Sequence, residues 1–216
     1  MNRNADRSNA VPAIVLCGGR ATRMGGGDKC LAPFGGSTLL GAALARLAPQ
    51  CSHLAISANG DAARFHAFRL PVFPDPIPDF QGPLAGLLAG LQWAAGIAKA
   101  GTLLTTAGDT PFLPEDLVAR LSQARGDDRN AIAVAASQGR RHPVIALWPL
   151  SLLDDLRDFL TTSDSRSVIA FQSRHRTIDV PFGPHTLEPN CVDPFFNINT
   201  PADLAEAERL IAEGRT

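Results

Sequence analysis

The chain lacks an excess of charge of either sign. Its 216 residues include 20 basic and 21 acidic side chains, which gives a formal net charge of -1. Such a balance creates no general electrostatic field that would attract nucleic acid or an anionic membrane. Any anion must therefore be bound by a few local basic groups and backbone amides. This favours a small anionic ligand and predicts neither nucleic acid nor a membrane as a partner.

Paired cysteines and long apolar runs are also missing. Cys17, Cys30, Cys51 and Cys191 form no CxxC pair and no Cys/His cluster with zinc-ligand spacing, which is typical of thiols in a reducing compartment. No apolar stretch reaches the length of a membrane span. Residues 1–11 are polar and lack the apolar core of a signal peptide. We expect a disordered tail over 1–11 and a cytoplasmic protein.

Strand and helix patterns alternate along the remaining chain. Short apolar runs predict strands over 13–17, 53–57, 71–73, 101–106, 131–136, 143–148 and 177–180. Helices are predicted from 39 to 47 with Ser37 as cap, over 84–98, 115–123, 152–160 and 168–172, and after Thr200 with Pro201 at the first position. This order predicts a single α/β, Rossmann-like domain of three layers, with a mostly parallel sheet flanked by helices. Ligands of such sheets bind at the carboxyl ends of the strands.

The first candidate site is a glycine-rich loop directly after the first predicted strand. Residues 16–29 read LCGGRATRMGGGDK, with five glycines, two arginines and a lysine. Glycines let backbone amides point at a ligand, and Arg23 and Lys29 supply positive charge for triphosphate oxygens. The spacing is neither a Walker A loop nor GxGxxG. We interpret the loop as phosphate-binding; the alternative is a flexible turn with scattered basic residues.

The second candidate site is an acid that follows the predicted strand 101–106. This apolar strand leads into Gly108 and Asp109. The carboxylate would lie at the carboxyl end of the strand, in the same crevice as the glycine-rich loop. Magnesium in proteins is often held by one or two carboxylates together with substrate phosphates. We therefore predict Asp109 as a Mg²⁺ ligand, and the alternative is a side chain that only closes a turn.

These motifs together resemble the molybdenum cofactor guanylyltransferases, a family of small nucleotidyltransferases. The family opens with Leu-Ala-Gly-Gly, a few residues, and then Arg-Met-Gly-Gly-x-Asp-Lys. Its later motifs match Gly-Pro-Leu-Ala-Gly at 82–86, Asp-Thr-Pro at 109–111, His-Pro at 142–143 and Asn-x-Asn-Thr-Pro at 197–201. They occur in the family's order and cover almost the whole chain after the tail. Cys17 departs from the family's usual alanine. Both residues are small, so we expect little effect, except that a thiol beside the nucleotide would make the enzyme sensitive to oxidation.

The resemblance implies a role for each matching residue. Nucleotide-binding positions are Leu16, Cys17, Gly18, Gly19, Lys29, Asn59, Asp75 and Asp109. Catalytic roles fall to Lys29, Arg23 and Asp109, and acceptor binding to His142, Arg166, Asn197 and Asn199. Simpler structural roles stay open for several: a turn for Asn59, a loop acid for Asp75, a strand-edge residue for His142, a solvated residue for Arg166, and helix caps for the two later asparagines. The cytidine-using relatives have Leu-Ala-Ala-Gly where this chain has Gly18, which fits a guanine nucleotide.

The family's reaction is then the expected function. The phosphate of molybdopterin, or of the molybdenum cofactor, attacks the α-phosphorus of GTP, and pyrophosphate leaves. Such a nucleophile needs no strong base, which agrees with the lack of an obvious Ser/His/Asp or Cys/His set in the sequence. The nucleotidyltransferase domain would span 12–216, with a nucleotide half over about 12–112 and an acceptor half over about 113–216. Proteins that deliver or receive the cofactor are further expected partners. The alternatives are a cytidylyl or sugar-1-phosphate nucleotidyltransferase, or a nucleotide-binding module without turnover.

Overall fold

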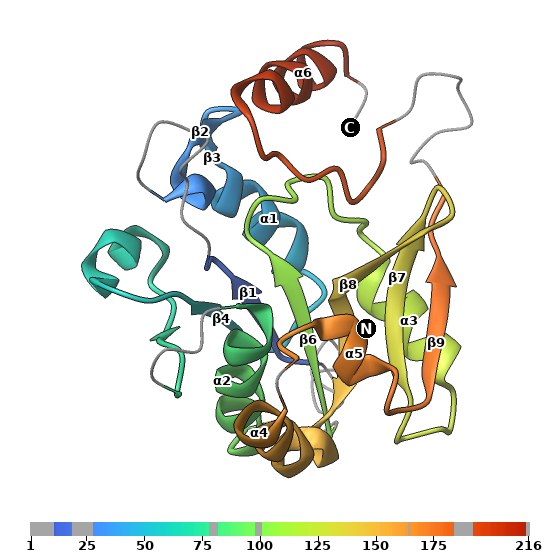
Figure 1. Ribbon diagram of the computed structural model, residues 1–216. Helices are drawn as coiled ribbons and strands as arrows, with labels where there is room; N and C mark the ends of the chain where they lie inside the picture. Colours follow the sequence, from blue (N-terminus) through green and yellow to red (C-terminus); the bar gives the residue numbers. More distant parts are fainter. Residues whose placement is uncertain are drawn as a thin grey trace, which may run out of the picture.

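A computed structural model describes residues 11–18, 28–77, 82–97, 101–163, 165–183 and 192–214. Within these ranges the chain builds one seven-stranded sheet with helices on both faces (Figure 1). The predicted tail lies outside the described residues except for its last residue, and so do Gly19 and Arg23. Among the described helices, none combines the length and the hydrophobicity of a membrane span.

The sheet has the strand order β5-β4-β1-β6-β8-β7-β9. Its strands are β1 (Ala13–Leu16), β4 (Leu54–Ser57), β5 (Val72–Phe73), β6 (Thr102–Ala107), β7 (Ile132–Ser137), β8 (Arg140–Pro149) and β9 (Thr177–Pro181). All neighbouring pairs are parallel except those of β8, which runs antiparallel to both β6 and β7. The predicted mostly parallel sheet is therefore confirmed.

The reversal of β8 has a local cause. Gln138 and Gly139 join β7 to β8 and have φ angles of 49° and 75°. Two residues with positive φ form the tight turn that favours a hairpin, and a two-residue connection is far too short for a parallel crossover. Strand β8 lies between β6 and β7 and runs antiparallel to both, so β6 and β7 point in the same direction. The carboxyl ends of β1, β4, β6 and β7 therefore lie at one edge of the sheet.

Successive side chains along a strand point to opposite faces of the sheet and pack in two different hydrophobic cores. Val15 packs in the core beneath α1 (Leu39–Leu47) and α3 (Leu117–Arg125). Its neighbour Ile14 packs in the opposite core, beneath the helices of the other face. Those helices are α2 (Pro83–Ala95), α4 (Leu153–Thr162) and α5 (Val168–Gln172). The result is the predicted order of helix layer, sheet and helix layer.

Several predicted helix starts are shifted. Thr38, not Ser37, caps α1, because its Oγ1 accepts a hydrogen bond from Gly41 N at 3.0 Å. Helix α3 begins at Leu117, so Glu115 precedes the helix. Five further short elements were not predicted, since segments of two to seven residues show little periodicity. These are η2 (Lys29–Leu31), β2 (Pro33–Phe34), β3 (Ser37–Thr38), η3 (Ala62–Phe68) and η4 (Leu150–Leu152).

The last helix, α6 (Pro201–Ala212), starts as predicted. Thr200 and Asp203 form a reciprocal capping box, and Pro201 takes the first turn. Its buried residues Ala207 and Leu210 belong to a small third core that includes Leu39 of α1. This packing fixes α6, and with it the segment 192–200, over the carboxyl edge of the sheet (Figure 1).

Candidate active site

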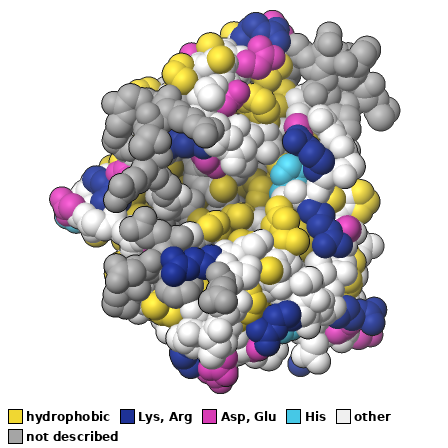
Figure 2. Space-filling model, viewed as in Figure 1, with side chains coloured by type: hydrophobic (Ala, Val, Ile, Leu, Met, Phe, Trp, Pro, Cys, Tyr) yellow, Lys and Arg dark blue, Asp and Glu magenta, His cyan; other side chains and the backbone are white. Residues whose placement is uncertain are grey.

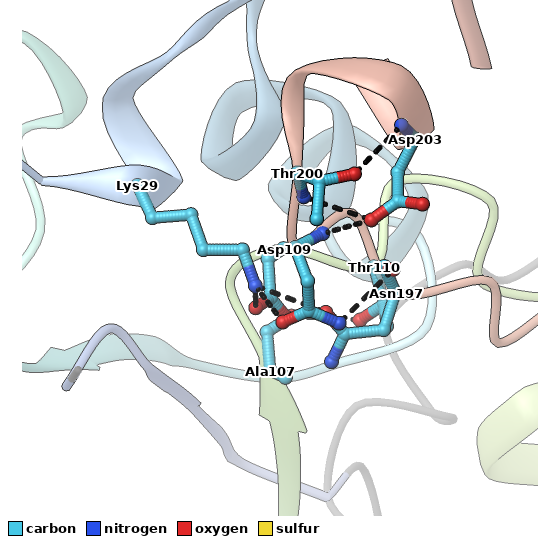
Figure 3. Close-up of polar contacts among 8 residues, drawn as sticks. Lys29, Ala107, Asp109, Thr110, Asn197, Thr200 and Asp203 are labelled. Carbon is cyan, nitrogen blue, oxygen red and sulfur yellow. Dashed lines mark hydrogen bonds and ion pairs between the residues drawn. The ribbon is translucent and has the colours of Figure 1, made fainter. Parts of the chain in front are cut away.

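Four side chains from distant parts of the chain meet at the carboxyl end of β6, and we call them the Lys29 cluster. They are Lys29, Asp109, Asn197 and Asn199 (Figure 3). The Nζ of Lys29 donates to the carboxylate of Asp109, to Oδ1 of Asn197 at 3.1 Å and to Oδ1 of Asn199 at 2.5 Å. The side chains of Lys29 and Asp109 are only 17% and 18% exposed. The end of the glycine-rich loop and the predicted metal ligand therefore share one site.

A glycine lets these two segments approach each other. A Cβ atom at Gly108 would lie 2.7 Å from Sγ of Cys17 and 3.1 Å from Cβ of Cys30. The first contact is shorter than real Cβ atoms show and the second is tighter than most, so a glycine at this position lets η2 pack closely against the ends of β1 and β6. Lys29 is the first residue of η2. The close packing at Gly108 thereby brings Lys29 beside Asp109.

The turn after β6 closes without the Asp109 side chain. Thr110 Oγ1 donates to the carbonyl of Ala107 at 2.8 Å, which leaves the Asp109 carboxylate facing the cluster. One of its oxygens, Oδ1, is buried and has no hydrogen-bond partner. A buried carboxylate oxygen without a donor is costly unless a cation binds it, so it fits a divalent metal ion.

The described residues hold no group of three or more His, Cys, Asp or Glu side chains that could bind a metal by themselves. A cation at Asp109 would thus take its other ligands from substrate phosphates and water, the arrangement typical of Mg²⁺.

The two asparagines are held by the start of α6. The backbone N–H of Ile198 donates to the carbonyl of Asp109 at 3.1 Å, and that of Asn199 donates to Oδ2 of Asp203 at 2.8 Å. Hydrogen bonds from Asn199 N–H and from Thr200 hold the pKa of Asp203 below its ordinary value. Asp203 therefore fixes Asn199 in addition to capping the helix. Asn197 and Asn199 are not themselves caps.

A second pair of predicted residues meets at the carboxyl ends of β4 and β5. Asn59 Nδ2 donates to Oδ2 of Asp75 at 2.6 Å, and Asp75 N donates to Oδ1 of Asn59 at 2.8 Å. Burial raises the pKa of the Asp75 carboxyl, and the Asn59 hydrogen bond partly opposes that shift. The structure brings these two predicted nucleotide-binding residues together, 16 positions apart in the chain.

Arg64 is a residue that the sequence did not single out. Its guanidinium pairs with the carboxylate of Asp28, the last residue before Lys29, and its Nη2 donates to the carbonyl of Asn59 at 2.5 Å. It therefore ties the end of the glycine-rich loop to the Asn59–Asp75 pair. Arg64 lies in η3, outside every motif, and only the three-dimensional contacts reveal it.

The residues at the end of β1 differ in what they face. Leu16 pairs with Ser57 and Ala107 in the sheet. Gly18 is exposed, and a Cβ atom there would meet no atom of the described part of the chain within 4 Å. Cys17, by contrast, is buried, and a hydrogen bond with Cys30, with burial as a further cause, raises the pKa of its thiol. A raised pKa lowers the thiolate fraction, so Cys17 is less open to oxidation than the sequence suggested.

In the second half of the chain, three polar residues form what we call the Ser137 cluster. Ser137 Oγ lies 2.7 Å from Nε2 of His142 and donates to Oδ1 of Asp193 at 2.7 Å. The imidazole also packs on the ring of Phe195, with centroids 4.7 Å apart. Arg166 is exposed, two residues before α5, and lies in neither cluster.

The face that carries these residues is hollowed. Figure 2 shows a depression in the middle of the molecule, with hydrophobic side chains in its floor. Arginine side chains lie along its right-hand rim, on the side of β7 and β8. A hollow at the carboxyl edge of the sheet, apolar inside and basic at the rim, suits an anionic ligand with an apolar body.

Comparison with known proteins gives a consistent result. Residues 13–178 match the model of the MobA-like NTP transferase domain. A curated relative from Rhodopseudomonas palustris (strain HaA2), named molybdenum cofactor guanylyltransferase, is 56% identical over 202 residues, covering 93% of this chain and 92% of the relative. A relative of the same name from Mesorhizobium japonicum is 51% identical over 201 residues, covering 93% of this chain and 96% of that protein.

Solved structures support the fold. Molybdopterin-guanine dinucleotide biosynthesis protein A from Archaeoglobus fulgidus has a TM-score of 0.72 at 20% identity, covering 94% of this chain and 100% of that one. Rv0371C from Mycobacterium tuberculosis, solved as a complex with manganese, has a TM-score of 0.63 at 17% identity, covering 93% and 98% of the two chains. The chain therefore belongs to the MobA-like NTP transferases, as a nucleotidyltransferase of the group whose curated members are named molybdenum cofactor guanylyltransferases.

Proposed function

We propose that this enzyme transfers GMP from GTP to the terminal phosphate of molybdopterin or of the molybdenum cofactor, with release of pyrophosphate. The observation that carries the proposal is the Lys29 cluster, where a lysine and an acid with a free buried oxygen meet at the carboxyl edge of the sheet. The names of the relatives supply the acceptor. The finer proposal is that Mg²⁺ is the metal, for which the single carboxylate of Asp109 is a suitable ligand.

The chemistry needs positioning and charge neutralisation more than proton transfer. An oxygen of the acceptor phosphate forms a bond to the α-phosphorus of GTP, and the bond from that phosphorus to pyrophosphate breaks. The nucleophile is already an anion, so no side chain has to remove a proton from it. Lys29, and by resemblance Arg23, would stabilise the triphosphate, and the loop amides after Gly18 would add donors. A Mg²⁺ ion on Asp109 would supply Lewis-acid stabilisation of phosphate charge.

Lys29 connects the two substrates in this proposal. Its ammonium has three donors, and in the structure they meet one carboxylate and two amide oxygens. Two of those partners, Asn197 and Asn199, come from the proposed acceptor half of the domain, residues 113–216. We therefore assign the asparagines to the place where the acceptor phosphate meets the triphosphate, between the acceptor half and the nucleotide half over 12–112.

Guanine selectivity is proposed to reside in the Asn59–Asp75 pair. Guanine presents two neighbouring N–H donors, on N1 and on the exocyclic amine, and an ionised carboxylate offers only acceptors. The Asp75 carboxylate can accept from both donors. Cytosine and adenine have an exocyclic amine but no ring N–H beside it, so they cannot make the same pair of hydrogen bonds. Gly18 supports the same site, since a Cβ atom there would lie more than 4 Å from the other residues that the structure describes. A cytidylyl or sugar-1-phosphate nucleotidyltransferase is the alternative within the same chemistry.

The proposed setting is the cytoplasm, where GTP is available and the free thiols of Cys17, Cys30 and Cys51 stay reduced. Proteins that deliver molybdopterin or receive the finished cofactor complete the proposed partners.

The proposal is tested by incubating the enzyme with molybdopterin, Mg²⁺ and one nucleoside triphosphate at a time. We expect pyrophosphate release and a product with the mass of the guanine dinucleotide with GTP, and at most a trace with CTP or ATP. Preferred use of CTP would favour the cytidylyl alternative. GTP binding without any pyrophosphate release in the presence of molybdopterin would instead favour a module that only binds nucleotide.

A further inference from the structure

The Ser137 cluster contains the residue types of a hydrolase triad but in a different order. In a nucleophilic triad the histidine touches both the serine and the acid. Here Ser137 touches both, because its Oγ lies 2.7 Å from His142 Nε2 and donates to Asp193 Oδ1 at 2.7 Å. The serine gives its proton to a carboxylate and is itself 4% exposed, so it cannot act as an activated nucleophile. The hydrogen bonds must serve another purpose.

The chain of hydrogen bonds fixes the tautomer of His142. An ionised carboxylate can only accept, and Asp193 Oδ1 accepts from Ser137 Oγ and from the backbone N–H of Phe195 at 3.0 Å. Since the only proton of Ser137 goes to Asp193, its oxygen must accept from Nε2–H of His142. A neutral imidazole has one donor and one acceptor nitrogen, so Nδ1 is the acceptor.

The surroundings of His142 keep the ring neutral. Burial is the largest effect on its pKa and lowers it, and the positive charge of Arg140 on the same strand acts in the same direction. Asp193, on the facing segment, opposes them and raises the pKa. The net direction is downward, and the ring also packs on Phe195. At neutral pH, therefore, His142 presents an uncharged, oriented acceptor.

The cluster lies within reach of the Lys29 cluster. Ser137 ends β7, which runs parallel to β6, so both clusters occupy the same edge of the sheet. One segment joins them, since Asp193 contacts Ser137 and Asn197 contacts Lys29. Four residues of extended chain span at most about 14 Å. A molecule with its phosphate at Lys29 could extend along this segment to His142.

We propose that His142 Nδ1 is a specificity-determining hydrogen-bond acceptor for an N–H group of the acceptor's pterin ring, and that Ser137 and Asp193 are positioning residues that fix its tautomer. This inference rests on the proposed function, because the pterin is part of the proposed acceptor. Pterins carry several N–H donors, and an oriented neutral acceptor selects for them and against heterocycles without a donor.

The first test reads the tautomer without any substrate. In ¹⁵N-detected NMR of the histidine rings, we expect the His142 Nε2 to carry the proton at pH 7.5 in the wild type. Ser137→Ala should produce a mixture of tautomers. Asp193→Asn should reduce the population of the Nε2-protonated tautomer less, because an amide oxygen can still accept from Ser137. A wild-type ring protonated only on Nδ1 would overturn the proposal.

The second test separates acceptor binding from turnover. We expect His142→Phe, which keeps a ring against Phe195, to raise KM for molybdopterin about tenfold, the effect of one lost hydrogen bond of roughly 1.4 kcal/mol. Ser137→Ala should raise the same KM by a smaller factor, about two- to threefold, because a mixture of tautomers still presents the acceptor part of the time. KM for GTP and the rate at saturating molybdopterin should stay close to wild type. His142→Asn, whose amide can place an acceptor near the Nδ1 position, should recover part of the loss. Ser173→Ala, an exposed serine at the end of α5, is the matched control.

The outcomes are distinguishable. Unchanged KM for molybdopterin in both His142→Phe and Ser137→Ala, in a wild type that makes the dinucleotide, would refute the role of His142 and leave the proposed function standing. No product from the wild type with molybdopterin would overturn the proposed function and the pterin contact with it. Thermal unfolding of each variant shows whether a change in KM reflects only a loss of folded protein.

Discussion

Lys29 and Asp109, 80 positions apart in the chain, form an ion pair at the carboxyl edge of the sheet. Both side chains are largely buried, so the pair is less screened by solvent than an ordinary surface ion pair. Asp109 uses only Oδ2 for the lysine and keeps Oδ1 without a partner. The pair therefore has capacity for one further cation, and two predictions follow from its two partners.

Asp109→Asn keeps the shape of the side chain but removes the negative charge. We expect the rate of GMP transfer to fall by at least about a hundredfold, because a neutral amide oxygen holds a divalent cation poorly and the phosphate charge is then less stabilised. Steady-state rates over a range of Mg²⁺ concentrations measure the effect. A near-normal rate at saturating Mg²⁺ would show that Asp109 does not bind the metal.

Lys29→Met keeps most of the side-chain length and removes the ammonium. We expect kcat/KM for GTP to fall ten- to a hundredfold, equivalent to about 1.5–3 kcal/mol for a hydrogen bond to a charged group. Initial rates with GTP varied at fixed molybdopterin give this value. If the kinetics with GTP do not change, Lys29 does not contact the triphosphate, and its contacts with Asn197 and Asn199 are only structural.

Gly18→Ala tests whether the absence of a side chain at Gly18 is needed for nucleotide binding or for folding. The added methyl would meet no atom of the described residues within 4 Å, so we expect the free energy of unfolding to be unchanged and KM for GTP to rise several-fold. Gly90→Ala is the matched control, because its Cβ would lie 2.6 Å from Ile14 and 2.8 Å from Leu103. That variant should lose about 1–3 kcal/mol of unfolding free energy from overpacking. Equal KM values for GTP in Gly18→Ala and wild type would place the nucleotide away from Gly18.

Much of this site could be predicted from the sequence, and the contacts that could not be predicted were missed for physical reasons. Lys29 and Asp109 each follow a buried strand, and parallel strands end at one edge, so their proximity follows from the alternation of elements. The contacts of Ser137 and Asp193 depend on how the segment 192–200 crosses the sheet edge, and no local pattern encodes that path. Arg64 was missed for the same reason, because a side chain that bridges two loops leaves no periodic signal.

Arg64→Leu tests this bridge. Loss of the guanidinium should free Asp28 and the carbonyl of Asn59, so the loop and the Asn59–Asp75 pair lose their fixed relation. We expect KM for GTP to rise about three- to tenfold with little change in the rate at saturating GTP, since positioning energy of roughly 1 kcal/mol is lost before chemistry. Arg157→Leu removes an exposed pair with Asp154 on α4 and is the control. A similar change in both variants would mean that Arg64 has no specific role.

The lowered pKa of His142 predicts how stability depends on pH. An unfolded histidine titrates near its ordinary value of about 6.5, whereas the folded His142 takes up its proton only at lower pH. Between those two values the unfolded chain binds more protons, so the free energy of unfolding decreases as the pH falls below about 6.5.

Urea unfolding of the wild type and of His142→Phe at a series of pH values from 7.5 to 5 isolates this contribution, because other titrating groups are common to both. We expect the wild type to lose stability more steeply than the variant over this range. Parallel curves would mean that the imidazole titrates alike in the folded and unfolded chain, so that burial does not lower the pKa of His142.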